Sequence, residues 1–252
     1  MINALICAYK SGDVLGLALR QLVDAPCVTR ILVADGPHLG PVKPGHKVDH
    51  PSVQKVVARI ASRKIVYEHT DTCPTRADKV NHILKCVSND CSWILGVDSD
   101  EVYHEDALKR LANFLTSAPY GRYSIQSINP YPDLRHQIKI VDWKPRVYRW
   151  IDGAQAPAGH DRFHQLILHP KHKLPQAAGK RQRVLDTIVR VPPDVCEVWH
   201  LHELRATRSR VKKGKDASVI WGGGGKQCPS KVYPLDITSA PKSIRCLGRD
   251  TL

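Results

Sequence analysis

Strand and helix patterns alternate along the first hundred residues of this chain, and this alternation constrains its fold more than any other feature. Short apolar runs typical of buried strands lie at 4–9, 30–34, 64–68 and 93–98. Apolar residues with helical spacing predict helices at 13–24, 53–62 and 75–87. Apolar strands joined by helices are typical of a parallel sheet with helices on both faces. We therefore predict an α/β fold with a mostly parallel sheet.

The rest of the chain continues this domain and then changes character. We expect a helix at 105–117 and strands at 123–129 and 137–150. The glycine run Gly222–Gly225 and the polar segment after it indicate a loop or tail at 216–252. The predicted organisation is thus a first half, 1–118, a second half of the same domain, 119–215, and a basic C-terminal extension.

Basic residues outnumber acidic ones, which gives the 252-residue chain a formal charge of +14. Twelve lysines and arginines fall within 171–215, and this segment ends in a basic run without an acid. The run includes Arg205, Arg208, Arg210, Lys212 and Lys213. Such a density favours a polyanionic partner such as nucleic acid, an anionic membrane surface or a nucleotide diphosphate, although a solvated helix face has the same composition.

Cysteine usage and hydropathy bear on the compartment. The eight cysteines form no Cys-x-x-Cys pair, which favours reduced thiols and excludes a zinc ribbon. The chain starts without a basic leader, and no segment reaches the length of a transmembrane helix. We expect a soluble, cytoplasmic protein, located in the host cytoplasm if it is viral.

Three carboxylates come directly after the fourth apolar run. Asp98, Asp100 and Glu101 stand where that strand ends, and ligands of open α/β sheets bind beyond the carboxyl ends of the strands. Carboxylate oxygens suit Mg²⁺ or Mn²⁺, which keep coordination positions for water and substrate phosphate. Alternatively, the acids only favour the positive end of the next helix. The pattern indicates a cation site for a phosphate-bearing substrate.

Neither a Gly-x-Gly-x-x-Gly after the first strand nor a P-loop sequence is present. Three strand-ending motifs instead resemble the GT-A-fold glycosyltransferases of the family-2 type. These motifs are Ala8-Tyr9, Ala34-Asp35-Gly36 and Val97-Asp98-Ser99-Asp100-Glu101, and the resemblance covers roughly residues 3–118.

The resemblance implies a Rossmann-like GT-A fold and a nucleotide-sugar donor, with a UDP-sugar as the first expectation. The base would lie near Ala8, Tyr9 and Asp35, where a carboxylate accepts a hydrogen bond from a uracil-like N–H and a tyrosine ring stacks. Taken singly, Asp35 could equally cap a turn and Tyr9 could pack in the core.

The resemblance also implies how the diphosphate is held. Asp98 and Asp100 would bind it through Mn²⁺ or Mg²⁺, which neutralises charge on the departing group, and Ser99 and Lys79 would complete the donor site. In this family a C-terminal histidine often completes the metal site. That role falls to His200 or His202, which share one face if 198–204 is a strand; two surface histidines are the alternative.

The catalytic base is the role with the weakest pattern. The family usually carries a Glu-Asp pair downstream of the metal motif, and this chain has none in the expected stretch. Asp161 is the first candidate and Asp152 the second, although each could be a turn residue beside a glycine. Arg146 alternates with apolar residues and could reach a phosphate or a polyanionic acceptor.

These inferences lead to one main hypothesis: a metal-dependent hexosyl- or pentosyltransferase. The acceptor is a hydroxymethylated base in DNA, as in viral DNA glucosylation, or alternatively a saccharide or lipid-linked intermediate at a membrane surface. A non-catalytic nucleic-acid-binding protein and a nucleotidyltransferase are the competing classes. The sequence lacks the glycine-rich phosphate loop that would favour the latter.

Overall fold

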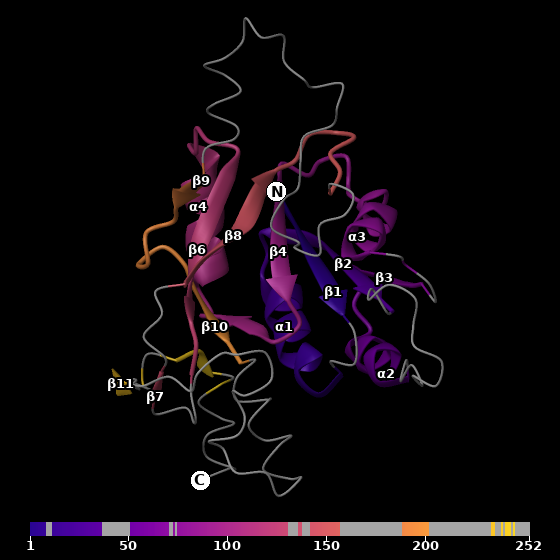
Figure 1. Ribbon diagram of the computed structural model, residues 1–252, viewed down its shortest axis with the longest axis horizontal. Helices are drawn as coiled ribbons and strands as arrows, with labels where there is room; N and C mark the ends of the chain where they lie inside the picture. Colours follow the sequence, from indigo (N-terminus) through magenta and orange to yellow (C-terminus); the bar gives the residue numbers. More distant parts are fainter. Residues whose placement is uncertain are drawn as a thin grey trace, which may run out of the picture.

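The computed structural model describes residues 1–8, 12–36, 51–70, 73, 75–130, 136–137, 142–156, 188–201, 233–234, 238, 240–242 and 244. Within this part, a nine-stranded sheet forms the centre of the molecule (Figure 1). The predicted α/β class is therefore confirmed.

The strands of this sheet are β1 (Ile2–Ala8), β2 (Val28–Asp35), β3 (Ile65–His69), β4 (Trp93–Asp98), β5 (Glu101–Tyr103), β6 (Arg122–Ile128), β8 (Asp142–Arg149), β9 (Ile188–Arg190) and β10 (Glu197–His200). A separate pair consists of β7 (His136–Gln137) and β11 (Tyr233–Pro234). The helices are α1 (Gly12–Asp24), α2 (Pro51–Ile60), α3 (Arg76–Leu84) and α4 (Ala107–Thr116).

The sheet has the order β3-β2-β1-β4-β8-β6-β10-β5, and β9 pairs with β6. Strands β1 to β4 are mutually parallel, whereas β8 runs antiparallel to both β4 and β6. Because the chain turns from β3 back across β1 to β4, the order reverses between β1 and β4, where ligands of open α/β sheets bind. This arrangement is the mostly parallel, Rossmann-like α/β sheet that the sequence predicted.

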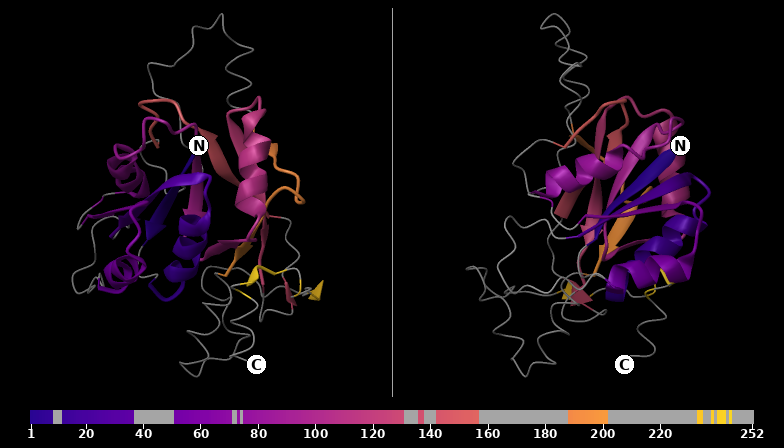
Figure 2. Two further views of the ribbon diagram at one scale, coloured as in Figure 1. Left: turned by 180° about the vertical axis from the view of Figure 1, so that it is seen from behind. Right: turned by 90° about the vertical axis from the view of Figure 1, so that its right-hand side faces the viewer.

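Helices cover both faces of the sheet, as predicted. Helices α1, α2 and α4 pack on one face, and α1 and α4 stand in front of the sheet when the molecule is seen from behind (Figure 2). Leu15, Leu19 and Leu22 of α1 are fully buried in that core. Helix α3 packs on the other face, and its start is fixed by a capping box between Thr75 and Asp78.

Two elements differ from the sequence prediction. The acids lead not directly into a helix but first into β5, whose three residues are too few to show a period. The predicted strand at 137–150 comprises β7 and β8, and 138–141 lie outside the described residues. Helix α4, which follows β5, begins at Ala107 rather than at residue 105 as predicted.

Part of the predicted C-terminal tail packs against the domain. Ala240 and Ile244 are fully buried in a small apolar cluster with Val102, Trp199 and Leu201. These described residues therefore belong to the fold, because β5 and β10 present an apolar surface that they cover. The boundaries at 118 and 215 stay a prediction. None of the helices in the described part is both long and apolar enough to cross a bilayer.

Candidate functional site

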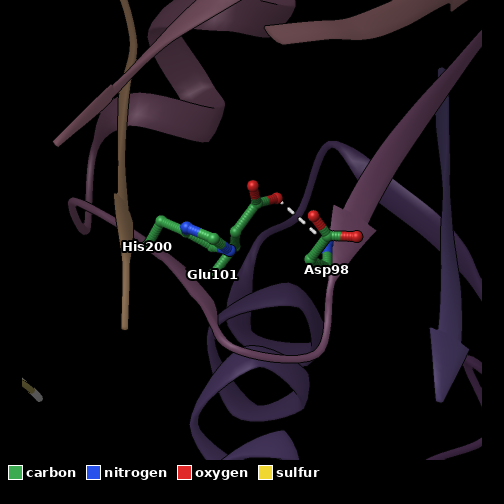
Figure 3. Close-up of side chains that lie close together, drawn as sticks. All are labelled: Asp98, Glu101 and His200. Carbon is green, nitrogen blue, oxygen red and sulfur yellow. Dashed lines mark hydrogen bonds between the residues drawn. The ribbon is translucent and has the colours of Figure 1, made fainter. Parts of the chain in front are cut away.

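Three side chains that can ligate a cation gather at the carboxyl end of β4. They are Asp98 at the end of β4, Glu101 at the start of β5 and His200 on β10, and their ligating atoms all lie within 4.8 Å of one another (Figure 3). Residues from distant parts of the sequence thus form one cluster where the sequence predicted a cation site.

A tight turn and a strand pairing bring these residues together. The backbone N–H of Asp98 donates to Glu101 Oε2 at 2.9 Å, which folds the acidic segment back on itself. Strand β5 then pairs antiparallel with β10, and His200 lies directly opposite Glu101. Side chains directly opposite in an antiparallel pair are close neighbours, so this register places the imidazole beside the acids.

Asp100 joins the cluster from the turn between β4 and β5. Its side chain is buried, and its Oδ1 lies 3.5 Å from His200 Nε2. The backbone N–H of Leu201 donates to the carbonyl of Asp100 at 2.8 Å, which ties the turn to the end of β10. Both acids predicted as metal ligands, Asp98 and Asp100, therefore lie beside His200.

The orientation of His200 is set by neighbours on β8 and after β6. Its Nδ1 lies 3.1 Å from Asn129 Oδ1 and 3.3 Å from Lys144 Nζ. If Nδ1 carries the proton, it donates to the Asn129 carbonyl oxygen and Nε2 is the acceptor atom on the Asp100 side; if Nδ1 instead accepts from the Lys144 ammonium, the proton is on Nε2. A ring nitrogen held in this way by an outer hydrogen bond is typical of histidine metal ligands.

Arg146 differs from its predicted role. It was expected to contact a phosphate or a polyanionic acceptor, or else only to flank a half-exposed strand, but its side chain is 0% exposed and its guanidinium donates to both Asp98 and Glu101. This position is inside the acid cluster, so a contact with a polyanionic surface is not available to it. Burial opposes its charge, but Glu101 and Asp98 outweigh burial and raise the pKa of Arg146.

Glu101 is the most enclosed acid of the cluster. Burial raises its pKa above the ordinary range for glutamate, whereas the charge of Arg146 opposes that rise. Both of its oxygens already accept hydrogen bonds, Oε1 from Arg146 and Oε2 from the Asp98 amide. Glu101 is thus suited to hold the cluster together.

The donor atoms of the cluster fit a divalent cation. Asp98, Asp100 and Glu101 carry three negative charges when ionised, and the positive charges of Arg146 and Lys144 leave a net negative charge that a cation can balance. Carboxylate oxygens suit both Mn²⁺ and Mg²⁺, whereas an imidazole nitrogen is a ligand more typical of transition-metal ions than of Mg²⁺. The residues present therefore fit the predicted cofactor.

Asp35 ends β2 near this edge but is enclosed. It is 1% exposed, and its carboxylate accepts from the Gly36 amide at 2.7 Å and from the Tyr67 hydroxyl at 2.9 Å. His69 Nδ1 lies 3.4 Å from the same carboxylate. Gly36 has φ +119°, and a Cβ there would lie 2.0 Å from the Thr70 carbonyl oxygen, so the turn after Asp35 requires glycine. The predicted contact of Asp35 with a base stays a prediction.

The other predicted donor-site residues lie along the same edge. Lys79 of α3 is fully buried, and its ammonium donates to the carbonyls of Ala8 and Gly36, each at 2.7 Å. It therefore ties the carboxyl ends of β1 and β2 together. Ser99 lies half-buried in the turn between β4 and β5. Tyr9 is outside the described residues.

Asp152, the second candidate for the acceptor base, lies near the other end of the sheet from the acid cluster. Strand β8 runs antiparallel to β4, so its last residue, Arg149, pairs with Trp93 at the start of β4. Asp152 follows three residues after Arg149, in an exposed turn. Trp93 and Asp98 are the two ends of β4, and a strand of this length separates them by about 17 Å. The strand direction thus places Asp152 away from the acid cluster, and its role as the base stays a prediction.

Several predicted residues lie outside the described part of the chain. They are the first candidate base, Asp161, the second histidine, His202, and the basic residues Arg205, Arg208, Arg210, Lys212 and Lys213.

Sequence reasoning missed Asn129 as a member of the site and assigned no separate role to Glu101 within it. Glu101 was visible in the acidic motif, but its role depends on the turn that returns it to the Asp98 amide. For Asn129 no sequence signal is evident, because its contact with His200 joins residues 71 positions apart.

Comparison with known proteins finds similarity only among solved structures. No model of a protein family matches the sequence, and no curated protein is similar to it. Residues 1–349 of TarS from S. aureus match at 16% identity and a TM-score of 0.41, over 59% of this chain and 46% of that chain. TarS 1–349 in complex with UDP matches at 15% identity and a TM-score of 0.40, over 52% of this chain and 36% of that one.

A further solved structure is 4-diphosphocytidyl-2C-methyl-D-erythritolsynthase from Anaerococcus prevotii. It matches at 17% identity and a TM-score of 0.39, over 59% of this chain and 71% of that chain. This chain spans less than half the length of the two TarS chains. Similarity at this level assigns no activity, so a function for this protein has to rest on its own side chains.

Proposed function

We propose that this protein transfers a sugar from a nucleotide-sugar to an acceptor hydroxyl with the help of a divalent cation. The observation that carries the proposal is the meeting of Asp98, Asp100 and His200 at the carboxyl end of β4, beside the point where the strand order reverses. In an open α/β sheet this is the place where phosphate-bearing ligands bind.

The residues of the cluster divide the work of holding the diphosphate. Asp98, Asp100 and His200 would hold Mn²⁺ or Mg²⁺, which as a Lewis acid stabilises the charge that develops on a departing diphosphate. Asn129 orients the His200 ring, and Arg146 with Glu101 fixes Asp98. The cluster is largely buried, so its charges are weakly screened by solvent and act strongly on the phosphate.

The same edge of the sheet supports a place for the nucleoside. Asp98 pairs across to Cys7 on β1, and β2 with Asp35 is the next strand. Neighbouring strands lie about 4.8 Å apart, so the ends of β4 and β2 are separated by about 10 Å. A nucleoside diphosphate laid across β1 would reach from the acid cluster toward Asp35.

The acceptor proposal rests on the charge of the sequence. We propose a hydroxymethylated base in DNA as the first acceptor, because the chain carries a formal charge of +14. A saccharide or lipid-linked acceptor at an anionic membrane is the other candidate, since the same basic run would bind anionic lipid.

A nucleotide-sugar hydrolysis assay tests the proposal. UDP-glucose and UDP-GlcNAc are incubated with Mn²⁺ or with EDTA, and plain DNA, hydroxymethylated DNA or a lipid-linked saccharide is added. The proposal predicts turnover that requires the cation and rises with one acceptor. Tight DNA binding without turnover of any nucleotide-sugar would contradict it and would support a non-catalytic nucleic-acid-binding protein.

A further inference from the structure

We propose that Arg146 is the positioning residue of the cation site: it clamps Asp98 and Glu101 from the neighbouring antiparallel strand, so that Asp98 is held ready to ligate a divalent cation with Asp100 and His200. This inference rests on the proposed function. It replaces the surface role that the sequence suggested for Arg146.

A β-bulge places Arg146 at the cluster. On β6, Tyr123 pairs with Val147 and the next residue, Ser124, pairs with Pro145, so Arg146 is an extra residue without a paired position on β6. An extra residue of this kind bends the strand and redirects a side chain, and bulges are common beside functional sites. Proline inside a strand is also largely confined to sheet edges and bulges, and Pro145 lies directly before Arg146 at this bulge.

The contacts of Arg146 divide the cluster into two parts. Its guanidinium donates to Asp98 Oδ2 and Glu101 Oε1, and Glu101 Oε2 accepts from the Asp98 amide. Glu101 therefore has both oxygens engaged within the protein. One oxygen of Asp98 is fixed by the clamp, and the other is the oxygen that we assign to the cation.

The contact between Arg146 and Glu101 is shielded from solvent. Arg146 and Glu101 are both 0% exposed, so neither can exchange its partner for water without a large cost. The hydroxyl of Tyr103, on the same face of β5 as Glu101, is buried and has no hydrogen-bond partner within the described part of the chain.

Two explanations for the effect of Arg146 can be separated by charge. If Arg146 acts only through its charge, any variant with the same net charge should bind the cation equally well. If it acts by fixing Asp98, the geometry of the guanidinium is required. The double substitution Arg146→Met with Glu101→Gln removes one positive and one negative charge, so it keeps the net charge of the cluster while it removes the clamp.

The experiment measures Mn²⁺ affinity by the electron paramagnetic resonance signal of the free ion, together with thermal unfolding in EDTA. The variants are Arg146→Met, Arg146→Lys and the double variant. The control is Arg149→Met, because Arg149 lies on the same strand, exposed, at the other end of β8. UDP affinity is measured with and without Mn²⁺ for each protein.

We expect the double variant to unfold at a higher temperature than Arg146→Met, because the fully buried Glu101 no longer carries a charge without its partner, and still to bind Mn²⁺ about 10- to 100-fold more weakly than the wild type. Arg146→Lys should fall between, and Arg149→Met should bind as the wild type does. Wild-type affinity in the double variant would overturn the inference and leave the proposed function standing. Failure of the wild-type protein to bind either Mn²⁺ or UDP would overturn both.

Discussion

His200 on β10 lies directly opposite Glu101 on β5, although the two residues are 99 positions apart in the sequence. This antiparallel pairing brings a histidine from the second half of the chain to the acidic turn after β4. The candidate cation site is therefore a product of the sheet register, and a shift of one residue would turn His200 to the other face.

The side chain of Asp98 should be required for cation binding but not for folding. Asp98→Asn removes a ligand charge, while Glu101 still pairs with Arg146. Loss of a side chain that only hydrogen-bonds a metal ligand typically lowers metal affinity by about 10- to 100-fold. Because Asp98 is proposed as a direct ligand, we expect Mn²⁺ affinity and cation-dependent turnover to fall by at least about 100-fold. Circular dichroism checks the fold and titration with Mn²⁺ the affinity. Asp152→Asn is the matched control, because that acid lies at the other end of the sheet, and an equal loss there would contradict the site.

The hydrogen bond that His200 Nδ1–H donates to Asn129 Oδ1 should orient the imidazole ring. Asn129→Ala removes the acceptor for the ring Nδ1–H, so we expect Mn²⁺ affinity to decrease about tenfold with little change in unfolding temperature. Asn113→Ala, in the exposed part of α4, serves as the comparison. Unchanged affinity in Asn129→Ala would show that Lys144 or the strand alone fixes the ring.

The C-terminal segment should contribute to the stability of the domain. Ile244 is fully buried against β5 and β10, so Ile244→Ala should lower the free energy of unfolding by about 2–5 kcal/mol. Urea unfolding measures this change. Lys242→Ala, two residues away and exposed, should change it by less than about 0.5 kcal/mol. Similar values for the two variants would mean that this segment does not pack as described.

The stability of the protein should depend on the ionisation of Glu197. Burial raises the pKa of this half-buried carboxyl above its ordinary value of 4.5, so the folded state binds the proton more tightly than the unfolded state. The contribution of this proton to the free energy of unfolding is fully present below pH 4.5 and is lost as the pH rises through the pKa of Glu197 in the folded state. We therefore expect Glu197→Gln to be more stable than the wild type at pH 7 and to lose this advantage at about pH 4.

Urea unfolding of both proteins at the two pH values checks this prediction. An advantage of the glutamine variant that is the same at both pH values would show that Glu197 acts through packing and not through its charge.

Local pattern was sufficient to predict the first half of the fold. The strands and helices from β1 to β4 agree with the predicted ranges to within a few residues, because the helices bury one apolar stripe with helical spacing and most of these strands are short, largely apolar runs. The acids at the end of β4 were predicted as a cation site for a similar reason, since a strand that ends at the sheet edge places its next residues at that edge.

The second half was less predictable because its roles depend on contacts between strands. Arg146 has the alternating neighbours of an exposed strand residue, yet the bulge at Pro145 turns it into the core. Asp152 resembled a site residue by composition, but the direction of β8 carries it away from the acids. Neither the bulge nor the strand direction is encoded in a local period.

The sequence by itself determined the α/β class, the acids that end β4 and the excess of positive charge, because each of these depends on residue types within a few positions of one another. Only the tertiary structure decided that Arg146 and Glu101 lie inside the site, that His200 meets them and that Ile244 covers β10. These contacts join residues separated by dozens of positions, and they exist only once the sheet has set its order, direction and register.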